Sequence, residues 1–203
     1  QKNSVWHELS KIIKSDYKGE SGEDYVISLS VIDTGFFTRY AEQFIDKFDS
    51  NNLVYGIKGR FNKTYRSISK DTKAVSKSRE NLKLYIAEVD QLKDELSSYM
   101  KIKKAEDRTQ PNGFMNFPQP KSGKYDYQAY FKHFESESRK EVKEGQEVVG
   151  FKWQKKNSNV ENHFFDVRIY NLAAVYIYID LIKRTNPSKY KDLDWASFVE
   201  MVK

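Results

Sequence analysis

The stretch ENHFFDVRIYNLAAVYIYI, residues 161–179, decides the fold, because its apolar side chains recur at the spacing of one helix face. The positions of that face are Phe165, Ile169, Leu172, Tyr176 and Ile179. Most of the remaining circumference is apolar as well, which is typical of a helix enclosed by other elements. The sequence therefore predicts a central, buried helix.

Polar residues stand in the first turn of this predicted helix. Asn162 is a favourable N-cap residue, which places His163 and Asp166 three residues apart on one edge of the helix. A carboxylate in the first turn can simply complement the helix dipole, a contribution of roughly 0.3–1 kcal/mol. Alternatively, Asp166, with or without His163, is a metal ligand on a rigid element, because buried charges are usually paired or coordinated. The second interpretation requires another acid to converge on Asp166.

Composition limits the class of protein. The chain has 203 residues and a mass of 24.0 kDa, so we expect residues 1–203 to form a single domain. It begins with Gln1, and we interpret it as a fragment of a longer protein. It contains no cysteine, which excludes disulfides and thiolate metal sites and fits a reducing compartment. Any metal must then be bound by oxygen and imidazole ligands, which favours Mg²⁺ or Mn²⁺.

The charge and hydropathy patterns favour a soluble protein that can bind polyanions. The net charge is +6 and the isoelectric point is about 9.1, which permits binding to nucleic acid without requiring it. The most apolar run, residues 172–179, is too short to cross a bilayer and is followed by Asp180. We therefore expect no membrane partner.

A β-α-β unit is predicted between residues 25 and 57. The apolar alternation of residues 25–32 predicts a strand that leads into Asp33, residues 40–48 repeat at helical spacing, and residues 53–57 form a second strand. Such a crossover joins parallel strands, so Asp33 lies at the carboxyl end of its strand, where ligands bind in open α/β sheets. An isolated Asp before a glycine is nevertheless more often a turn former.

The rest of the chain adds helices, strands and one basic segment. The other predicted elements are a helix at residues 6–15, a strand at 82–86, a helix capped by Asp90, a helix from Asp126, a strand at 149–153 and a tail helix within residues 184–203. Residues 60–80 are rich in Lys and Arg and show no apolar period. A solvated loop is the default interpretation of that segment, and contact with nucleic-acid phosphates is the alternative.

Several enzyme classes are excluded or disfavoured by the sequence. There is no phosphate-binding loop of the Gly-x-x-x-x-Gly-Lys-Ser/Thr type, and a cysteine nucleophile is impossible. The three histidines do not form a zinc-binding His-x-x-x-His arrangement. A restriction-type nuclease is disfavoured, because no acid stands two residues before the strand lysine Lys58.

Six motifs follow one another along the chain: VIDTG at 31–35, VYGIKG at 54–59, VD at 89–90 with Lys93, GFMNFP at 113–118, Phe134 with Glu137, and NHFFD at 162–166 with YNLAA at 170–174. In this order and spacing they resemble the C-terminal nuclease domain of the lambda-type large terminase subunits of tailed bacteriophages. The resemblance covers residues 25–183.

The resemblance implies an α/β fold of the RNase H-like type, a mixed sheet flanked by helices, in which carboxylates hold divalent metal ions. In that family one acid comes from the first strand of the sheet, one from the strand that ends in Asp-Thr-Gly and one from the C-terminal helix. Asp33 and Asp166 match the second and the third. Residues 1–24 contain no apolar strand that ends in an acid, so we expect the first strand or strands to be absent from this fragment.

The implied chemistry is phosphodiester hydrolysis with Mg²⁺ or Mn²⁺ held by Asp33 and Asp166. His163 is a further ligand, a proton shuttle or a group that orients Asp166. We expect Asp33 and Asp166 to face one another within about 8 Å, with His163 at the rim of their cleft. The candidate DNA contacts are Lys58, Arg60, Lys63, Arg66, Lys70 and Lys73, of which Lys58 either meets the scissile phosphate or packs its stem along the sheet.

The sequence therefore predicts a metal-dependent endonuclease domain of a viral DNA-packaging terminase that cuts concatemeric double-stranded DNA. The implied partners are double-stranded DNA, the N-terminal ATPase portion of the same protein, the small terminase subunit and the portal, and the implied location is the host cytoplasm. The alternative, from another class, is a non-catalytic DNA-binding or docking module of a packaging motor. In that case Asp33 and Asp166 are structural, and the basic residues carry the function.

Overall fold

The computed structural model describes residues 4–19, 21–48, 53–60, 75–77, 83–107, 109–117 and 127–202. The chain divides into two compact units. Unit 1 comprises residues 1–59, 75–87 and 174–203, and unit 2 comprises residues 60–74 and 88–173. The predicted central helix is α5 (His163–Thr185), whose first half belongs to unit 2 and whose second half belongs to unit 1.

Helix α5 begins where the sequence predicts. Asn162 directly precedes it, and the Asn162 carbonyl accepts the first helical hydrogen bond, from the amide of Asp166 (3.0 Å). The predicted inner face is buried at Phe165, Ile169, Leu172 and Ile179, whereas Tyr176 is half-buried. Burying each large apolar side chain contributes about 1.5–3 kcal/mol, which fixes the rotation of the helix about its axis.

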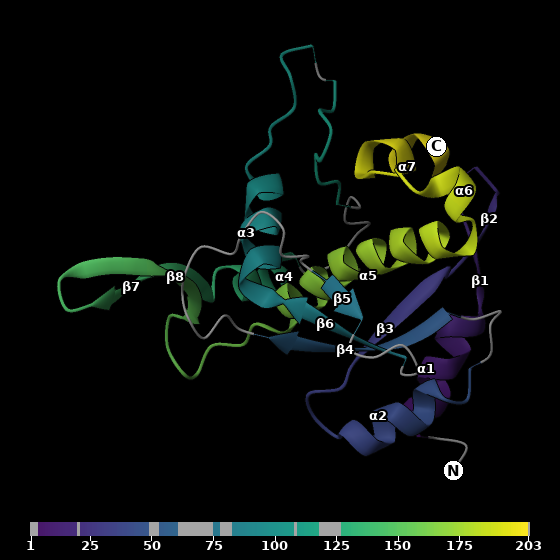
Figure 1. The fold of residues 1–203 in the computed structure, drawn as a ribbon, viewed down its shortest axis with the longest axis horizontal. Helices are drawn as coiled ribbons and strands as arrows, with labels where there is room; N and C mark the ends of the chain where they lie inside the picture. The colour runs from purple at the N-terminus through teal and green to yellow at the C-terminus, as the bar shows by residue number, and fades with distance from the viewer. Residues whose placement is uncertain are drawn as a thin grey trace. The chain divides into compact units, whose positions relative to one another are not determined.

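Unit 1 is built on a sheet with the strand order β3-β4-β6-β5 (Figure 1). The strands are β3 (Leu29–Asp33), β4 (Leu53–Arg60), β6 (Leu84–Glu88) and β5 (Val75–Lys77). Strands β3 and β4 are parallel, with Asp33 opposite Ile57, and they are joined through α2 (Thr38–Ile45), which confirms the predicted β-α-β unit. Strand β5 is antiparallel to β6.

The predicted strand at residues 25–32 is wrong in its extent. The segment forms two strands, β2 (Asp24–Val26) and β3, and β2 pairs with β1 (Asp16–Lys18) in a separate antiparallel ribbon. All residues of β1 and β2 are exposed, so the apolar alternation there does not mark a core-facing strand. Among the residues that the structure describes, β3 is thus an edge strand of the four-stranded sheet, and neither β1 nor β2 joins that sheet.

Helices cover both faces of this sheet within unit 1. Helices α1 (Val5–Lys14) and α2 lie on one face, and the second half of α5 lies on the other (Figure 1). Val54 of β4 belongs to the core beneath α1 and α2, together with Ile13, Phe44, Ile45 and Phe48. Neighbouring strand residues point to opposite faces, so Tyr55 and Tyr85 face the other layer. Burial there raises the pKa of Tyr85 to about 12.

The tail of the chain packs on the second half of α5. Helices α6 (Pro187–Tyr190) and α7 (Trp195–Val202) follow α5, and a small core joins Leu193 and Phe198 to Ile179. The predicted tail helix is therefore present as two helices. None of the helices in the described part of the chain is long and apolar enough to span a bilayer.

Unit 2 contains three helical elements and a two-stranded ribbon. Its elements are α3 (Val89–Met100), α4 (Tyr127–Phe134), the antiparallel pair β7 (Glu137–Glu144) and β8 (Glu147–Lys155), and the first half of α5. The rings of Phe134 and Trp153 lie 5.2 and 5.7 Å from that of Phe165. Asp90 does not cap α3 as predicted, because the helix begins at Val89 with Glu88 in the N-cap position.

Candidate functional site

Asp33 is presented by unit 1 at the carboxyl end of β3, as the sequence predicts. Its side chain is exposed, and its Oδ1 accepts a hydrogen bond from the amide of Gly35 (2.7 Å). A Cβ at Gly35 would lie only 3.0 Å from this oxygen, so the glycine gives the carboxylate room to fold back over the turn. The turn-former interpretation of Asp33 is therefore confirmed, and its second oxygen is left for another role.

Asp166 is presented by unit 2 at the edge of a buried charged cluster, which we call the Lys93 cluster: Lys93, Glu137, Asn162 and Asp166. Lys93 Nζ lies 2.6 Å from Glu137 Oε2 and 3.5 Å from Asp166 Oδ1. Asn162 Nδ2 donates to the other oxygen of Glu137 (2.6 Å). The side chains of Lys93 and Glu137 are 3% and 4% exposed, whereas that of Asp166 is 38% exposed. Asp166 is therefore the carboxylate through which the cluster meets solvent.

Local sequence explains how these side chains meet. The buried face of α3 consists of Val89, Leu92, Lys93 and Leu96, so the lysine occupies a core position of an amphipathic helix. Its ammonium lies 5.2 Å from the ring centroid of Phe165, which provides a cation–π contact. Glu137 is the first residue of β7 and ends up beside the start of α5. Buried charges need partners, and the ion pair supplies them.

Burial dominates the electrostatics of Asp166. Its pKa is raised mainly by burial and further by the neighbouring charge of Glu137, while Lys93 and Lys155 act in the opposite direction. The pKa of Asp90 is also raised by burial, although its Oδ1 accepts a hydrogen bond from the amide of Trp153 (3.0 Å). Lys93 thus favours the ionised forms of Asp90 and Asp166, whereas burial favours their protonated forms.

His163 is exposed on the first turn of α5 and lies near a second histidine. The ring centroids of His163 and His133 are 6.1 Å apart. His133 Nδ1 accepts a hydrogen bond from the amide of Phe164 (3.3 Å), so His133 helps to satisfy the free amides at the start of α5. No signal in the sequence indicated this function of His133.

The basic candidates fall into three groups. Lys58 is exposed on β4, one residue beyond the partner of Asp33. Arg60 donates through Nε to the buried Glu88 (2.6 Å), while its own side chain stays 61% exposed. The other four, Lys63, Arg66, Lys70 and Lys73, lie outside the described residues.

The candidate metal ligands are individual carboxylates and do not form a preassembled group. Among the described residues, no three Asp, Glu or His side chains are grouped so as to hold a metal ion. Both oxygens of Glu137 accept hydrogen bonds, so Asp166 is the accessible carboxylate of the Lys93 cluster in unit 2, and Asp33 is the exposed candidate ligand in unit 1. Carboxylate oxygens are what Mg²⁺ and Mn²⁺ prefer, and Mg²⁺ commonly takes one or two carboxylates and keeps several waters. The donor chemistry therefore fits these ions, while the predicted proximity of Asp33 to Asp166 stays a prediction.

Sequence reasoning did not assign a role to Lys93, Glu137 or Asn162 in the site, although all three stand in the quoted motifs. One signal was available. Residues 89, 92, 93 and 96 follow the spacing of a single helix face, so a lysine at position 93 is out of place on an apolar surface. Nothing local to Glu137 predicts its burial.

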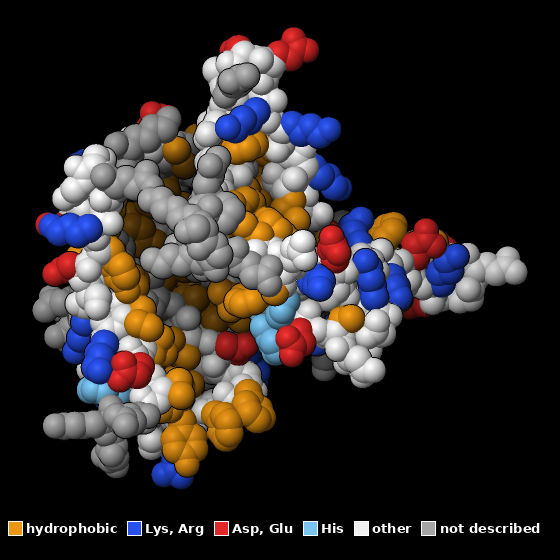
Figure 2. Space-filling view, turned by 180° about the vertical axis from the view of Figure 1, so that it is seen from behind, with side chains coloured by type: hydrophobic (Ala, Val, Ile, Leu, Met, Phe, Trp, Pro, Cys, Tyr) orange, Lys and Arg blue, Asp and Glu red, His pale blue; other side chains and the backbone are white. Residues whose placement is uncertain are grey.

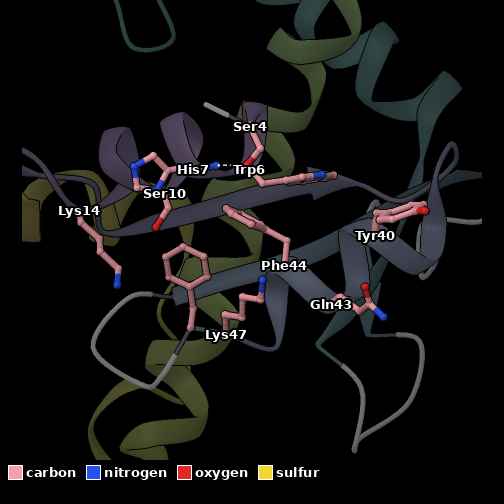
Figure 3. Close-up of a pocket in the computed structure, with 10 residues that line it drawn as sticks. Ser4, Trp6, His7, Ser10, Lys14, Tyr40, Gln43, Phe44 and Lys47 are labelled. Carbon is pink, nitrogen blue, oxygen red and sulfur yellow. Dashed lines mark hydrogen bonds between the residues drawn. The ribbon is translucent and has the colours of Figure 1, made fainter. Parts of the chain in front are cut away.

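Unit 1 also contains a pocket of about 450 Å³ between α1 and α2. Lys14 and Tyr40 lie at its opposite ends, and Trp6 and Phe44, with ring centroids 4.9 Å apart, lie between them (Figure 3). Asp33 does not line this pocket, which is therefore separate from the candidate acid.

The described elements define an α/β protein with one candidate acid at a strand end and another in the first turn of a helix. Residues 1–183 match the family model of the terminase large subunit gpA, endonuclease domain. The chain belongs to this family, which confirms the resemblance drawn from the motifs and makes it an endonuclease domain of a terminase large subunit. Searches of curated proteins and of solved structures found no match.

Proposed function

We propose that this domain cuts concatemeric viral double-stranded DNA by divalent-metal-dependent hydrolysis, with Asp33 and Asp166 as the metal-holding carboxylates. The observation that carries the proposal is the half-buried Asp166, held by a buried ion pair on the first turn of a rigid helix in a chain of the endonuclease family. The parallel β3 and β4 and the helix α5 support an RNase H-like arrangement in which both units form one nuclease domain.

Each residue has a distinct task in this proposal. Asp33 and Asp166 hold Mg²⁺ or Mn²⁺, which supply activation of water and stabilisation of the leaving oxygen when bound. Lys93 is a positioning residue, because it is too buried to touch DNA and instead fixes Glu137 and Asp166. His163, at the exposed edge of the same turn, holds or moves a proton near Asp166, and Lys58 contacts phosphates. Arg60, Lys63, Arg66, Lys70 and Lys73 extend the phosphate-binding surface.

Nicking of supercoiled plasmid DNA in Mn²⁺ or Mg²⁺ tests the proposal. We expect Asp33→Ala and Asp166→Ala each to abolish nicking while circular dichroism shows a folded chain. Asp192→Ala is the matched control, because Asp192 is an exposed acid of the tail. Full nicking by the Asp166→Ala variant would refute the assignment.

A second candidate function is a non-catalytic DNA-binding or docking module of the packaging motor. This function is favoured because no three metal-binding side chains are grouped together within the described residues. The same assay separates the two functions, because such a module binds duplex DNA in Mn²⁺ without nicking it. In either case we propose that the domain works in the host cytoplasm with the ATPase portion of its own protein, the small subunit and the portal.

A further inference from the structure

The loop that follows Asp33 and the first turn of α2 expose three aromatic side chains. Phe36, Phe37 and Tyr40 are 77%, 63% and 59% exposed. The ring centroids of Phe36 and Phe37 are 4.4 Å apart, and those of Phe37 and Tyr40 are 6.1 Å apart. Hydrophobic side chains protrude at the lower edge of the molecule in Figure 2, the region occupied by α2 in Figure 1. We call these three residues the aromatic tip.

Hydrogen bonds hold the aromatic tip in place at both ends. The amide and the hydroxyl of Thr34 both donate to the Ile57 carbonyl of β4 (2.9 and 3.1 Å). The Thr38 hydroxyl donates to the Thr34 carbonyl (2.7 Å), and the amide of Tyr40 donates to the Phe37 carbonyl (2.9 Å). The rings are therefore carried by a braced turn between a strand and a helix.

The backbone of the tip is strained at Phe37. Its φ and ψ are 52° and 38°, the left-handed region that suits glycine or asparagine and disfavours a residue with a large side chain. A phenylalanine in this conformation costs backbone stability, and its exposed ring recovers none of that cost through burial. Such costs persist where function requires them, and this outlier motivates a functional hypothesis.

We propose that the aromatic tip contacts DNA bases beside the phosphate that is cut, either by stacking on them or by wedging between them. This inference rests on the proposed function, since it takes Asp33 as the metal-holding acid. Phe36 follows Asp33 by three residues at the carboxyl end of β3, and the exposed cation Arg39 lies within the same loop and helix start. Aromatic wedges and stacking platforms need only one or two rings, and a nearby cation suits the flanking phosphate.

The exposed area of the tip is enough for stacking on bases but too small to form a specific protein interface by itself. Aromatic side chains present about 150–250 Å² each, so at these exposures the three rings offer roughly 400 Å². A specific protein interface needs about 800 Å² from each partner. Base stacking is effective at the smaller size, because each stacked base contributes an affinity factor of roughly 5- to 150-fold.

The test compares Phe36→Ser, Phe37→Gly and the control Tyr25→Ser, which removes an aromatic ring of β2 that is 57% exposed. Binding to a fluorescent DNA duplex is measured in EDTA, so that no cleavage occurs, over a range of salt concentrations. We expect each tip variant to bind roughly 5- to 150-fold more weakly with an unchanged salt slope, because counterion release comes from phosphate contacts and not from rings. Phe37→Gly should melt no lower than the wild type, since glycine relaxes the strained backbone.

A second readout is 2-aminopurine placed in the duplex, whose fluorescence rises when its stacking is disturbed. It should rise with the wild type and with Tyr25→Ser, and not with the tip variants. Affinities within twofold of the wild type would overturn the proposal, and would leave a protein partner as the occupant of the tip. A loss of affinity that comes with a lower salt slope would also overturn it. A wild-type chain that binds no duplex would instead refute the proposed function itself.

Discussion

Replacing Lys93 with methionine should destabilise the fold strongly and in a pH-dependent way. Methionine keeps the apolar stem of the side chain, so the change removes mainly the ammonium group with its ion pairs and its cation–π contact to Phe165. Glu137 then retains one hydrogen bond, from Asn162, in a site that excludes water almost completely. Removing one partner of a buried ion pair typically costs about 3–5 kcal/mol.

The pH of the assay sets an upper limit to this cost. The variant can relieve the unpaired charge by protonating Glu137, and protonating a glutamate of ordinary pKa, about 4.3, costs about 1.4 kcal/mol per pH unit above that value. The free energy of unfolding should therefore fall by about 3–4 kcal/mol at pH 7 and by only about 1 kcal/mol at pH 5. The double variant Lys93→Met/Glu137→Gln removes both charges and should recover most of the loss.

Urea unfolding followed by circular dichroism at both pH values measures these differences. Lys11→Met is the matched control, because Lys11 pairs with Glu8 at 2.9 Å on the exposed face of α1. Breaking this exposed pair should leave the free energy of unfolding almost unchanged at either pH, because solvent screens the two charges. A loss below about 1 kcal/mol for Lys93→Met at pH 7, or an equal loss at the two pH values, would show that the Lys93 cluster is not a buried ion pair.

Three further changes probe the core and the site. Ile169→Ala should lower the free energy of unfolding by about 2–5 kcal/mol in urea, whereas Val167→Ala on the exposed side of α5 should change it by less than about 0.5 kcal/mol. Gly56→Ala should lower the free energy of unfolding by about 1–3 kcal/mol, since the new Cβ would lie 2.9 Å from Thr34 Cγ2, and an unchanged melting curve would contradict this. The pKa of Asp166 is raised in the folded state, so this group binds more protons in the folded protein than in the unfolded chain. The free energy of unfolding therefore falls as the pH rises from the ordinary Asp range upward. Asp166→Asn should therefore gain stability relative to the wild type as the pH rises from 4 to 7, and a gain that shrinks with pH would refute the raised pKa.

The elements that could be predicted from sequence are those whose burial leaves a local period. Helix α5 and the β-α-β unit were predicted because a continuous apolar stretch and a change from strand to helix spacing are visible in the residues themselves. The break between β2 and β3 was missed, because alternation does not reveal which sheet a strand joins. Strand β7, ESRKEVKE, was missed because most of its residues are exposed and charged, so no apolar alternation marks it.

The candidate site was predictable only at its accessible residues. Asp33 and Asp166 stand at positions where local rules apply, the end of a strand and the first turn of a helix. The burial of Glu137 depends on tertiary packing between α3, β7 and α5, which no window of sequence contains. Lys93 is an intermediate case. Its place on the apolar face of α3 can be predicted from the local sequence, but its partner Glu137 cannot, because that contact depends on tertiary packing.

The environment of Asp166 follows from the packing of its neighbours along α5. Successive residues of a helix are rotated by about 100°. Phe165, on one side of Asp166, is buried, and Val167, on the other, is exposed, so the carboxylate must lie at the boundary between core and solvent. Its partial exposure and raised pKa are therefore consequences of helix rotation, which Phe165 and Ile169 fix through their burial. A loop could change this environment by a small movement, but a helix locked by two core side chains holds the carboxylate in one direction, as the proposed metal site requires.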